Sequence, residues 1–136
     1  MLPIKVLLVD DHRIVRQGVR AYLQTLADIQ VIAEADSGSA AITLVEQYQP
    51  DVVLMDLEMP GELDGIEATR QIRKVRPRTQ VIVVTSHHQD EYIFPAVRAG
   101  AISYLLKDVE PDELAAAIRK AANGQAVLDS RVASRI

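Results

Sequence analysis

The sequence predicts an α/β protein built on a doubly wound, five-stranded parallel sheet, most simply in the strand order 2-1-3-4-5, with helices on both faces. Five short apolar runs alternate with segments of helical period, which is typical of a parallel sheet with crossover helices. The runs are continuously apolar rather than alternating, as in strands that are buried on both faces. Because each crossover is right-handed, few other arrangements remain.

Composition indicates one globular domain and narrows its chemistry. Of the 136 residues, 49% are hydrophobic and 25% are charged, and a chain of this length can enclose an adequate core. The net charge of −4 argues against direct binding of nucleic acid by this domain, and the absence of cysteine excludes disulfides and thiolate chemistry. Because no apolar stretch reaches membrane-spanning length and no signal-peptide pattern is present, we expect a cytoplasmic protein with no membrane partner.

Each predicted strand is a short, mostly apolar run bounded by polar or turn-forming residues. The second run is the least apolar, and the third, bounded by polar residues and a proline, has the clearest pattern of a buried central strand. The expected strands are residues 5–9, 30–35, 52–55, 81–84 and 102–106.

Each predicted helix has a recognisable start or stop signal. Ser37 is a good N-cap for the second helix, and Pro77 follows the third. Gly100 stops the fourth helix, and Pro111 opens the fifth. Because Pro95 belongs in the first turn of a helix, we expect the fourth helix to be short and to begin only one or two residues before it. The expected helices are residues 13–26, 38–48, 65–76, 94–99 and 111–123, and residues 129–136 could begin another.

Helical spacing also predicts which side chains face the sheet. The expected inward stripe of the first helix is Ile14, Val15, Val19, Tyr22, Leu23 and Leu26. That of the third helix is Ile66, Thr69, Ile72 and Val75.

Polar side chains follow four of the predicted strands at the point where each strand ends. Asp10 and Asp11 follow the first strand, and Asp56 follows the third. Thr85 follows the fourth, and Lys107 follows the fifth. In the order 2-1-3-4-5 these strand ends converge at the switch point, where open α/β sheets bind ligands. Each residue alone could be a cap or a surface charge, but five polar groups at successive strand ends indicate a functional site.

The five groups suit phosphoryl transfer onto a carboxylate. Three neighbouring carboxylates cannot all stay ionised without a counter-charge, and Mg²⁺ with its oxygen ligands relieves the repulsion. We expect Asp56 to attack the phosphorus, with Mg²⁺ on Asp11 and Asp56 neutralising the phosphoryl oxygens. Thr85 and Lys107 would then hold two of those oxygens.

Four stretches carry a resemblance to a known family. They are Val-Asp-Asp at 9–11, Met-Asp-Leu-Glu-Met-Pro at 55–60, Val-Thr-Ser at 84–86 and Gly-Ala-Ile-Ser-Tyr-Leu-Leu-Lys-Asp at 100–108. With these stretches the chain, from about residue 4 to residue 123, resembles the receiver domain of bacterial two-component response regulators. The last stretch is most similar to regulators with a LuxR-type helix-turn-helix output.

The resemblance implies a phosphorylation-activated signalling switch. Asp56 would be the phosphoacceptor for a sensor histidine kinase or a small phospho-donor, and Asp10 and Asp11 would organise Mg²⁺. The backbone carbonyl of Glu58 would be a further metal ligand. The chain would not be an enzyme beyond its own phosphoryl transfer and dephosphorylation.

The resemblance also implies how the signal leaves the site. Thr85 and Lys107 would be the switch pair, and Tyr104 would move with Thr85 and relay the change to a dimerisation or output face. A homodimer would form on phosphorylation, and the full-length protein would regulate transcription, binding DNA only through an output domain.

The expected boundaries are residues 1–124 for the receiver and 125–136 for the start of a linker or an extra helix. The second segment is too short for an output domain, so the chain is either part of a longer protein or a stand-alone receiver.

The sequence departs from the family pattern at two places. Three residues, Gly61, Glu62 and Leu63, separate Pro60 from the following Asp-Gly pair, where the family usually has two. The loop beside the site is therefore expected to differ in conformation. Pro95 is the second departure, and it is expected to alter the face formed by the fourth helix, the fifth strand and the fifth helix.

The three histidines are interpreted as non-ligands. His87 and His88 are adjacent and cannot both face one metal from a regular element, although His87 could line the mouth of the site. His12 lies next to the acidic pair without a ligand partner at metal spacing.

Two alternatives to a signalling switch remain. A phosphohydrolase of the haloacid dehalogenase type also uses an aspartyl phosphate, but it needs Asp-x-Asp at a strand end, and here Asp56 is followed at that spacing by Glu58. The other alternative is a binding module that never uses its phosphorylation site.

Overall fold

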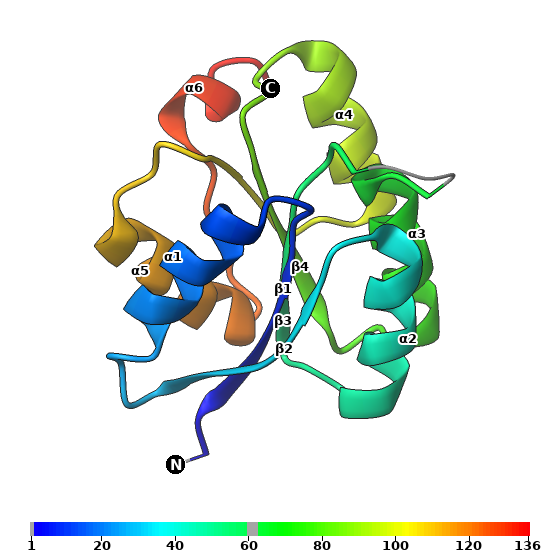
Figure 1. Cartoon of the computed structure of the whole chain (residues 1–136). Coiled ribbons are helices and arrows are strands. Elements are labelled where there is room, and N and C mark those ends of the chain that lie inside the picture. The colour runs from blue at the N-terminus through cyan, green and yellow to red at the C-terminus, as the bar shows by residue number, and fades with distance from the viewer. Residues whose placement is uncertain (1, 60–62) are drawn as a thin grey trace.

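The computed structural model describes residues 2–59 and 63–136 and has the predicted architecture, a five-stranded parallel sheet in the order β2-β1-β3-β4-β5. Helices α1 and α5 cover one face of the sheet, and α2, α3 and α4 cover the other (Figure 1). The strands are β1 (Ile4–Val9), β2 (Ile29–Ala35), β3 (Val52–Met55), β4 (Gln80–Thr85) and β5 (Ser103–Leu106). The helices are α1 (Arg13–Leu23), α2 (Gly38–Tyr48), α3 (Gly65–Val75), α4 (Asp90–Ala99), α5 (Pro111–Ala122) and α6 (Ser130–Ala133).

Strand register brings the carboxyl ends of the central strands to one level. Val9, the last residue of β1, pairs with Met55, the last residue of β3. Asp10 and Asp56 are the next residues along the chain, and they therefore leave the sheet side by side. Thr85, the last residue of β4, pairs with Leu106 of β5, so Lys107 leaves the sheet next to β4.

The core lies on both faces of the sheet, as continuously apolar strands require. All four residues of β3 and all four of β5 are buried. One apolar cluster lies between the sheet and the α1–α5 layer, and two lie between the sheet and the α2–α4 layer. Each fully buried Val, Leu or Ile contributes roughly 1.5–3 kcal/mol of transfer free energy. The two strands that lead to Asp56 and Lys107 are therefore buried along their whole length.

The structure contradicts the expected short fourth helix. α4 begins at Asp90 rather than beside Pro95, and Pro95 lies inside the helix. Proline has no N–H to bond the carbonyl four residues earlier, a loss that costs about 3 kcal/mol in a helix interior. The first turn closes without it, because the N–H groups of Tyr92 and Ile93 donate to the carbonyl of Gln89 at 3.0 and 3.1 Å. Complete burial of apolar side chains on the inner face offsets the lost bond.

Two side chains expected to face the sheet are exposed instead. Ile14 of α1 is 83% exposed, and Val75 of α3 is 49% exposed. Both lie in a terminal turn of their helix. Ser37 behaves as predicted: its hydroxyl accepts a hydrogen bond from the N–H of Ala40 at 3.2 Å.

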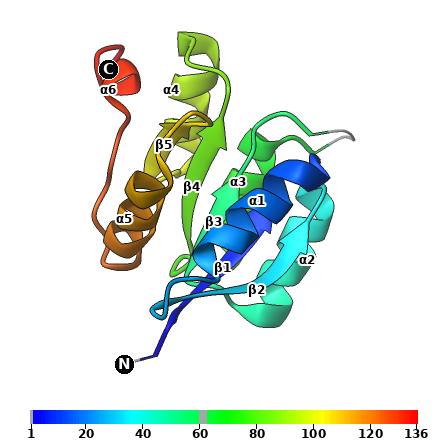
Figure 2. The same cartoon turned by 60° about the vertical axis from the view of Figure 1, so that its left-hand side comes forward.

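Beyond α5, the chain returns along β5 and forms the short helix α6 near α4 (Figure 2). The helix expected within residues 129–136 is thus present. The expected change of the loop at Gly61–Leu63 concerns residues of which only Leu63 lies within the described part of the chain. Across residues 2–59 and 63–136, every helix is too short or too polar to cross a membrane.

Candidate functional site

Backbone hydrogen bonds to neighbouring strands hold the two central carboxylates. The N–H of Asp10 donates to the carbonyl of Ala35 at 3.1 Å, and the N–H of Asp56 donates to that of Val9 at 2.9 Å. Asp10 also accepts from the N–H of His12 at 2.8 Å, which turns the chain toward α1. Both carboxylate-bearing residues are buried, with exposures of 6% for Asp10 and 4% for Asp56. Their positions are therefore set by the sheet and not by a mobile loop.

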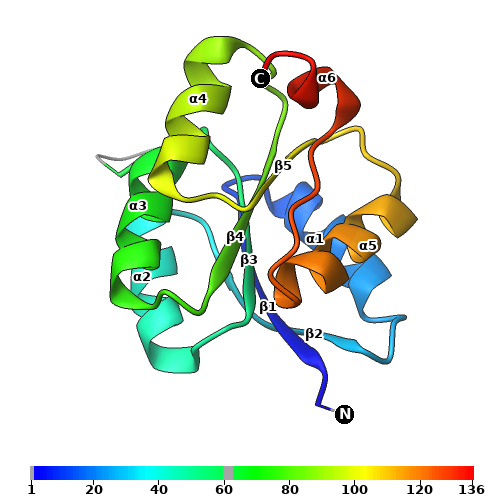
Figure 3. The ribbon, with the colours of Figure 1, turned by 180° about the vertical axis from the view of Figure 1, so that it is seen from behind.

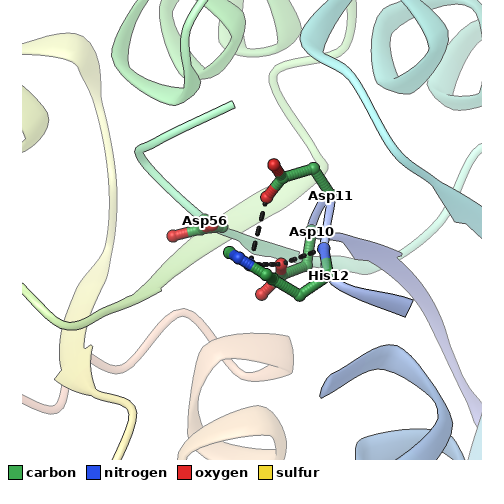
Figure 4. Close-up of side chains that lie close together, drawn as sticks. All are labelled: Asp10, Asp11, His12 and Asp56. Carbon is green, nitrogen blue, oxygen red and sulfur yellow. Dashed lines mark hydrogen bonds and ion pairs between the residues drawn. The ribbon is translucent and has the colours of Figure 1, made fainter. Parts of the chain in front are cut away.

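Four side chains gather at the ends of β1 and β3 (Figure 4). Asp10, Asp11, His12 and Asp56 each place one potential ligand atom within 4.8 Å of the others. His12 Nδ1 lies 3.1 Å from an oxygen of Asp10 and 3.2 Å from an oxygen of Asp11. The expectation that His12 has no partner at metal spacing is thus wrong, because the turn at Asp10 folds the ring back over the acidic pair.

Lys107 is the counter-charge that the strand order predicts. Its Nζ lies 3.0 Å from Asp10 Oδ2 and 3.4 Å from Asp56 Oδ2. One ammonium faces three carboxylates, since Asp11 adjoins the same pair, so negative charge remains in excess. Oxygen ligands with excess negative charge fit a hard divalent cation such as Mg²⁺.

The pKa values of Asp56 and Lys107 reflect this excess of negative charge. Burial, followed by repulsion from Asp10, raises the pKa of Asp56 from 3.8 to about 6, against the opposing attraction of Lys107. Burial alone would lower the pKa of Lys107, but its contacts with the two carboxylates outweigh burial and raise it. The Asp56 carboxylate is therefore destabilised as an anion in the metal-free protein, and added positive charge would relieve it.

We expect this strain to appear as a pH-dependent stability difference between wild type and Asp56→Asn without metal. Between pH 3.8 and about 6 the folded wild type binds a proton that the unfolded chain releases, so its stability falls as pH rises. The stability of Asp56→Asn relative to wild type should therefore rise by about 2 kcal/mol from pH 4 to pH 7.5. Urea denaturation in EDTA at both pH values measures it. Asp36→Asn, at the exposed end of β2, should show no such trend, and a pH-independent advantage of Asp56→Asn would contradict the prediction.

Thr85 and Tyr104 lie behind this cluster and are both completely buried. Thr85 Oγ1 accepts a long hydrogen bond from the N–H of His87 at 3.5 Å, and the Tyr104 hydroxyl donates to the His87 carbonyl at 2.6 Å. The segment that follows β4 thus connects the two side chains. Glu58, two residues after Asp56, is exposed, and its carboxylate lies 2.6 Å from His87 Nε2.

Two features of the site are not evident in the sequence. One is the contact of Glu58 with His87, whose ring stacks on Tyr92 with 4.2 Å between ring centroids. It joins the segments after β3 and β4 to the start of α4, and sequence spacing contains no signal for it. The other is Gly65, where an added Cβ would lie 2.1 Å from the carbonyl oxygen of Asp56. The Asp-Gly pair that begins α3 is the available signal, although it indicates a turn and not a contact.

A hollow of about 530 Å³ adjoins the carboxylates. Asp11 and His12 line one side of it, and Glu58, Asp64 and Tyr92 line the other. It is open to solvent, and Leu57, the residue after Asp56, also lines it.

Comparison with known proteins identifies the family. The response regulator receiver domain matches residues 6–119. The chain is 47% identical over 133 residues to the transcriptional regulatory protein LiaR of Bacillus subtilis, covering 98% of this chain and 63% of that protein. It therefore spans less than two thirds of the length of this relative.

Two solved structures have the same fold. The signal receiver domain of a putative response regulator NarL from Mycobacterium tuberculosis has a TM-score of 0.87 and 33% identity, with 92% of this chain and all of that chain covered. A LuxR-family two-component response regulator from Aurantimonas has a TM-score of 0.89 and 36% identity, covering 97% of this chain and 94% of the other. The receiver domain matches residues 6–119, and the sheet has the order β2-β1-β3-β4-β5. This chain therefore belongs to the response regulator receiver domain family.

Proposed function

We propose that this domain is a phosphorylation-controlled switch in which Asp56 accepts the phosphoryl group. The observation that carries the proposal is the Lys107 ammonium, which bridges Asp10 and the buried Asp56 carboxylate at 3.0 and 3.4 Å, next to Asp11 at the wall of an open hollow. A nucleophile, a further acidic pair and a cation at one point are the groups that phosphoryl transfer to a carboxylate requires.

Each residue would have a distinct role in the transfer. Asp11, Asp56 and the backbone carbonyl of Glu58 would hold Mg²⁺, and Asp10 would orient the site. Bound Mg²⁺ would supply positive charge to the phosphoryl oxygens. An oxygen of Asp56 attacks the phosphorus, and the bond from phosphorus to the donor's leaving group breaks as the acyl phosphate forms. Lys107 would give up its contact with the Asp56 carboxylate and would instead contact one of the new phosphoryl oxygens.

Thr85 and Tyr104 would carry the change away from the site. The Thr85 hydroxyl would donate to a phosphoryl oxygen and so move toward Asp56. Phosphoryl oxygens are strong acceptors, and charge-assisted bonds contribute roughly 1.5–3 kcal/mol each. Because Tyr104 is bonded to the same His87 segment, this movement would stabilise its ring in the buried position and so set the packing of the α4–β5–α5 face.

The wider role is proposed from the relatives. A sensor histidine kinase would be the physiological donor, and the location would be cytoplasmic. LiaR is a transcriptional regulatory protein, and the Aurantimonas structure is of the LuxR family. We therefore propose that residues 125–136 begin the connection to an output domain that binds DNA, and that phosphorylation promotes a homodimer.

Mass spectrometry of the intact protein tests the phosphorylation step. After incubation with acetyl phosphate and Mg²⁺, the wild type should carry one phosphoryl group, and EDTA should prevent the gain. No gain with Mg²⁺ would refute the proposal and favour a binding module that does not use the site. Many turnovers on a phosphomonoester would instead favour a phosphohydrolase.

Removing one carboxylate should separate metal binding from the nucleophile. We expect Asp11→Ala to need at least about 10-fold more Mg²⁺ for half-maximal labelling, because the site loses a ligand while Asp56 remains. A titration of labelling rate against Mg²⁺ measures the change. Asp36→Ala, which removes an exposed carboxylate from the neighbouring strand end, is the matched control and should behave as wild type. An unchanged Mg²⁺ dependence in Asp11→Ala would place the metal elsewhere.

A further inference from the structure

The chain after α5 forms an additional element along the edge strand of the sheet. Residues 127–133, here named the latch, run beside β5 toward α4 (Figure 3). The latch pairs in parallel with Tyr104 of β5, and the N–H of Asp129 donates to the Tyr104 carbonyl at 3.2 Å. The N–H of Val127 donates to the hydroxyl of Ser103 at 2.9 Å. The latch thereby covers backbone groups that an edge strand would otherwise expose.

The latch also packs on the switch aromatic itself. Val132 is completely buried, although the rest of α6 is exposed. It belongs to one apolar cluster with Ile93 and Ala96 of α4 and with Tyr104, the largest fully buried side chain of the domain. If the Tyr104 ring left this cluster, a cavity would open in the apolar cluster that buries Val132, at a cost in free energy.

A second contact joins the latch to the loop that carries the site lysine. Arg131 binds the Asp108 carboxylate through both terminal nitrogens, at 2.6 and 2.9 Å. Asp108 directly follows Lys107, whose Nζ bridges the carboxylates of the site. Because Arg131 and Asp108 are largely exposed, this ion pair should contribute less to closure than Val132 does.

We propose that the latch closes on the inward position of Tyr104 and is thereby coupled to the phosphorylation of Asp56. The coupling rests on the proposed function and names a regulatory element of the same site. The two sites communicate through a contiguous path: the Tyr104 hydroxyl holds the His87 carbonyl, and the His87 N–H reaches Thr85. A phosphoryl group that draws Thr85 inward stabilises the inward ring, and the inward ring completes the surface under Val132.

Two consequences follow from this coupling. Coupling between two sites is reciprocal. If phosphorylation favours the closed latch by a given factor, then opening the latch must disfavour the phosphorylated arrangement by the same factor. The signal also reaches the chain beyond α5 within one molecule, before any second copy binds to the α4–β5 face.

Beryllium fluoride with Mg²⁺, a mimic of the phosphoryl group, provides the test on the whole 136-residue chain. In the wild type, the mimic should slow amide hydrogen exchange of residues 127–133. Val132→Ala should bind the mimic at least about 5-fold more weakly than wild type, the lower end of typical allosteric coupling. Arg131→Ala should shift affinity in the same direction by a smaller factor. Neither variant alters a group that contacts the mimic.

Two matched variants control for general destabilisation. Val97→Ala removes the same methyl groups from an exposed position of α4, and Arg119→Ala removes an exposed, two-pronged ion pair with Asp28. Both should bind the mimic as wild type does. If Val132→Ala does not fold, Arg131→Ala and the exchange measurement decide the matter.

Equal affinities in all variants, or latch exchange that ignores the mimic, would make the latch a static cover of the sheet edge and overturn the coupling. A wild type that labels normally would in that case leave the proposed function intact. A wild type that neither binds the mimic nor accepts phosphate would refute both proposals.

Discussion

Replacing Asp56 by Asn is expected to abolish phosphoryl transfer completely. The amide has nearly the shape of the carboxylate, and position 56 is buried and held by the backbone of β1, so the fold should persist. The variant lacks the anionic oxygen that attacks phosphorus, and it lacks a charge for Mg²⁺ and for Lys107, whose Nζ is 3.4 Å away in the wild type. Intact-mass analysis with acetyl phosphate and Mg²⁺ should find one phosphoryl group on wild type and none on the variant.

The neighbouring strand end offers the control for this experiment. Asp36 follows β2 on the same edge of the sheet, but it is exposed and lies outside the cluster of Asp10, Asp11 and Asp56. Asp36→Asn should be labelled at the wild-type rate. Labelling of Asp56→Asn at the wild-type rate would instead assign the phosphoacceptor to another residue.

Among the glycines at positions 18, 38, 65, 100 and 124, Gly65→Ala should cause the largest loss of stability. The new Cβ would lie 2.1 Å from the carbonyl oxygen of Asp56 and 2.7 Å from the Cα of Leu57. Both neighbours are backbone atoms, and the N–H of Gly65 also donates to the Leu57 carbonyl at 3.1 Å, so no flexible side chain can move aside. Overpacking of side chains typically costs 1–3 kcal/mol, and a backbone overlap should exceed about 3 kcal/mol.

The same substitution would also affect phosphoryl transfer to Asp56. Relief of the overlap requires the start of α3 to move away or the backbone at Asp56 to shift, and the carboxylate would lose its alignment with Asp10 and Lys107. Urea denaturation and the rate of labelling by acetyl phosphate should therefore both change.

Gly18→Ala is the matched control for Gly65→Ala. Gly18 lies inside α1, and an added Cβ there meets no atom within 4 Å. Alanine is the better helix former, so this variant should be about 0.5–1 kcal/mol more stable than wild type and should be labelled normally. Equal stabilities of the two variants would show that the start of α3 yields without cost.

The five-stranded fold and most of the site could be predicted from local pattern. Continuously apolar runs have a definite physical meaning, because only strands covered on both faces can bury every side chain. Asp10, Asp56 and Lys107 follow such runs directly, and parallel strands end at one edge. The convergence of these three residues therefore depends only on the order and the register of the strands.

Other features were decided by tertiary packing. Pro95 predicts a late helix start by local rules, yet α4 begins five residues before it, because burial of the inner face and a closed first turn offset one missing hydrogen bond. Ile14 has the spacing of a core residue, but it lies in the first turn of α1 and is exposed. Helical period determines direction around the helix axis and contains no information on where the neighbouring layer ends.

By itself, the sequence determined the alternation of strands and helices and the acidic strand ends, because these follow from patterns within short segments. The strand order followed from these elements together with the topology rules for parallel sheets. Only the tertiary structure decided that His87 contacts Glu58, that Gly65 lies against the Asp56 carbonyl, and that the latch covers Tyr104. Each of these contacts joins residues from separate elements. Their distances depend on how whole elements pack, a balance of burial, sterics and charge that no local pattern records.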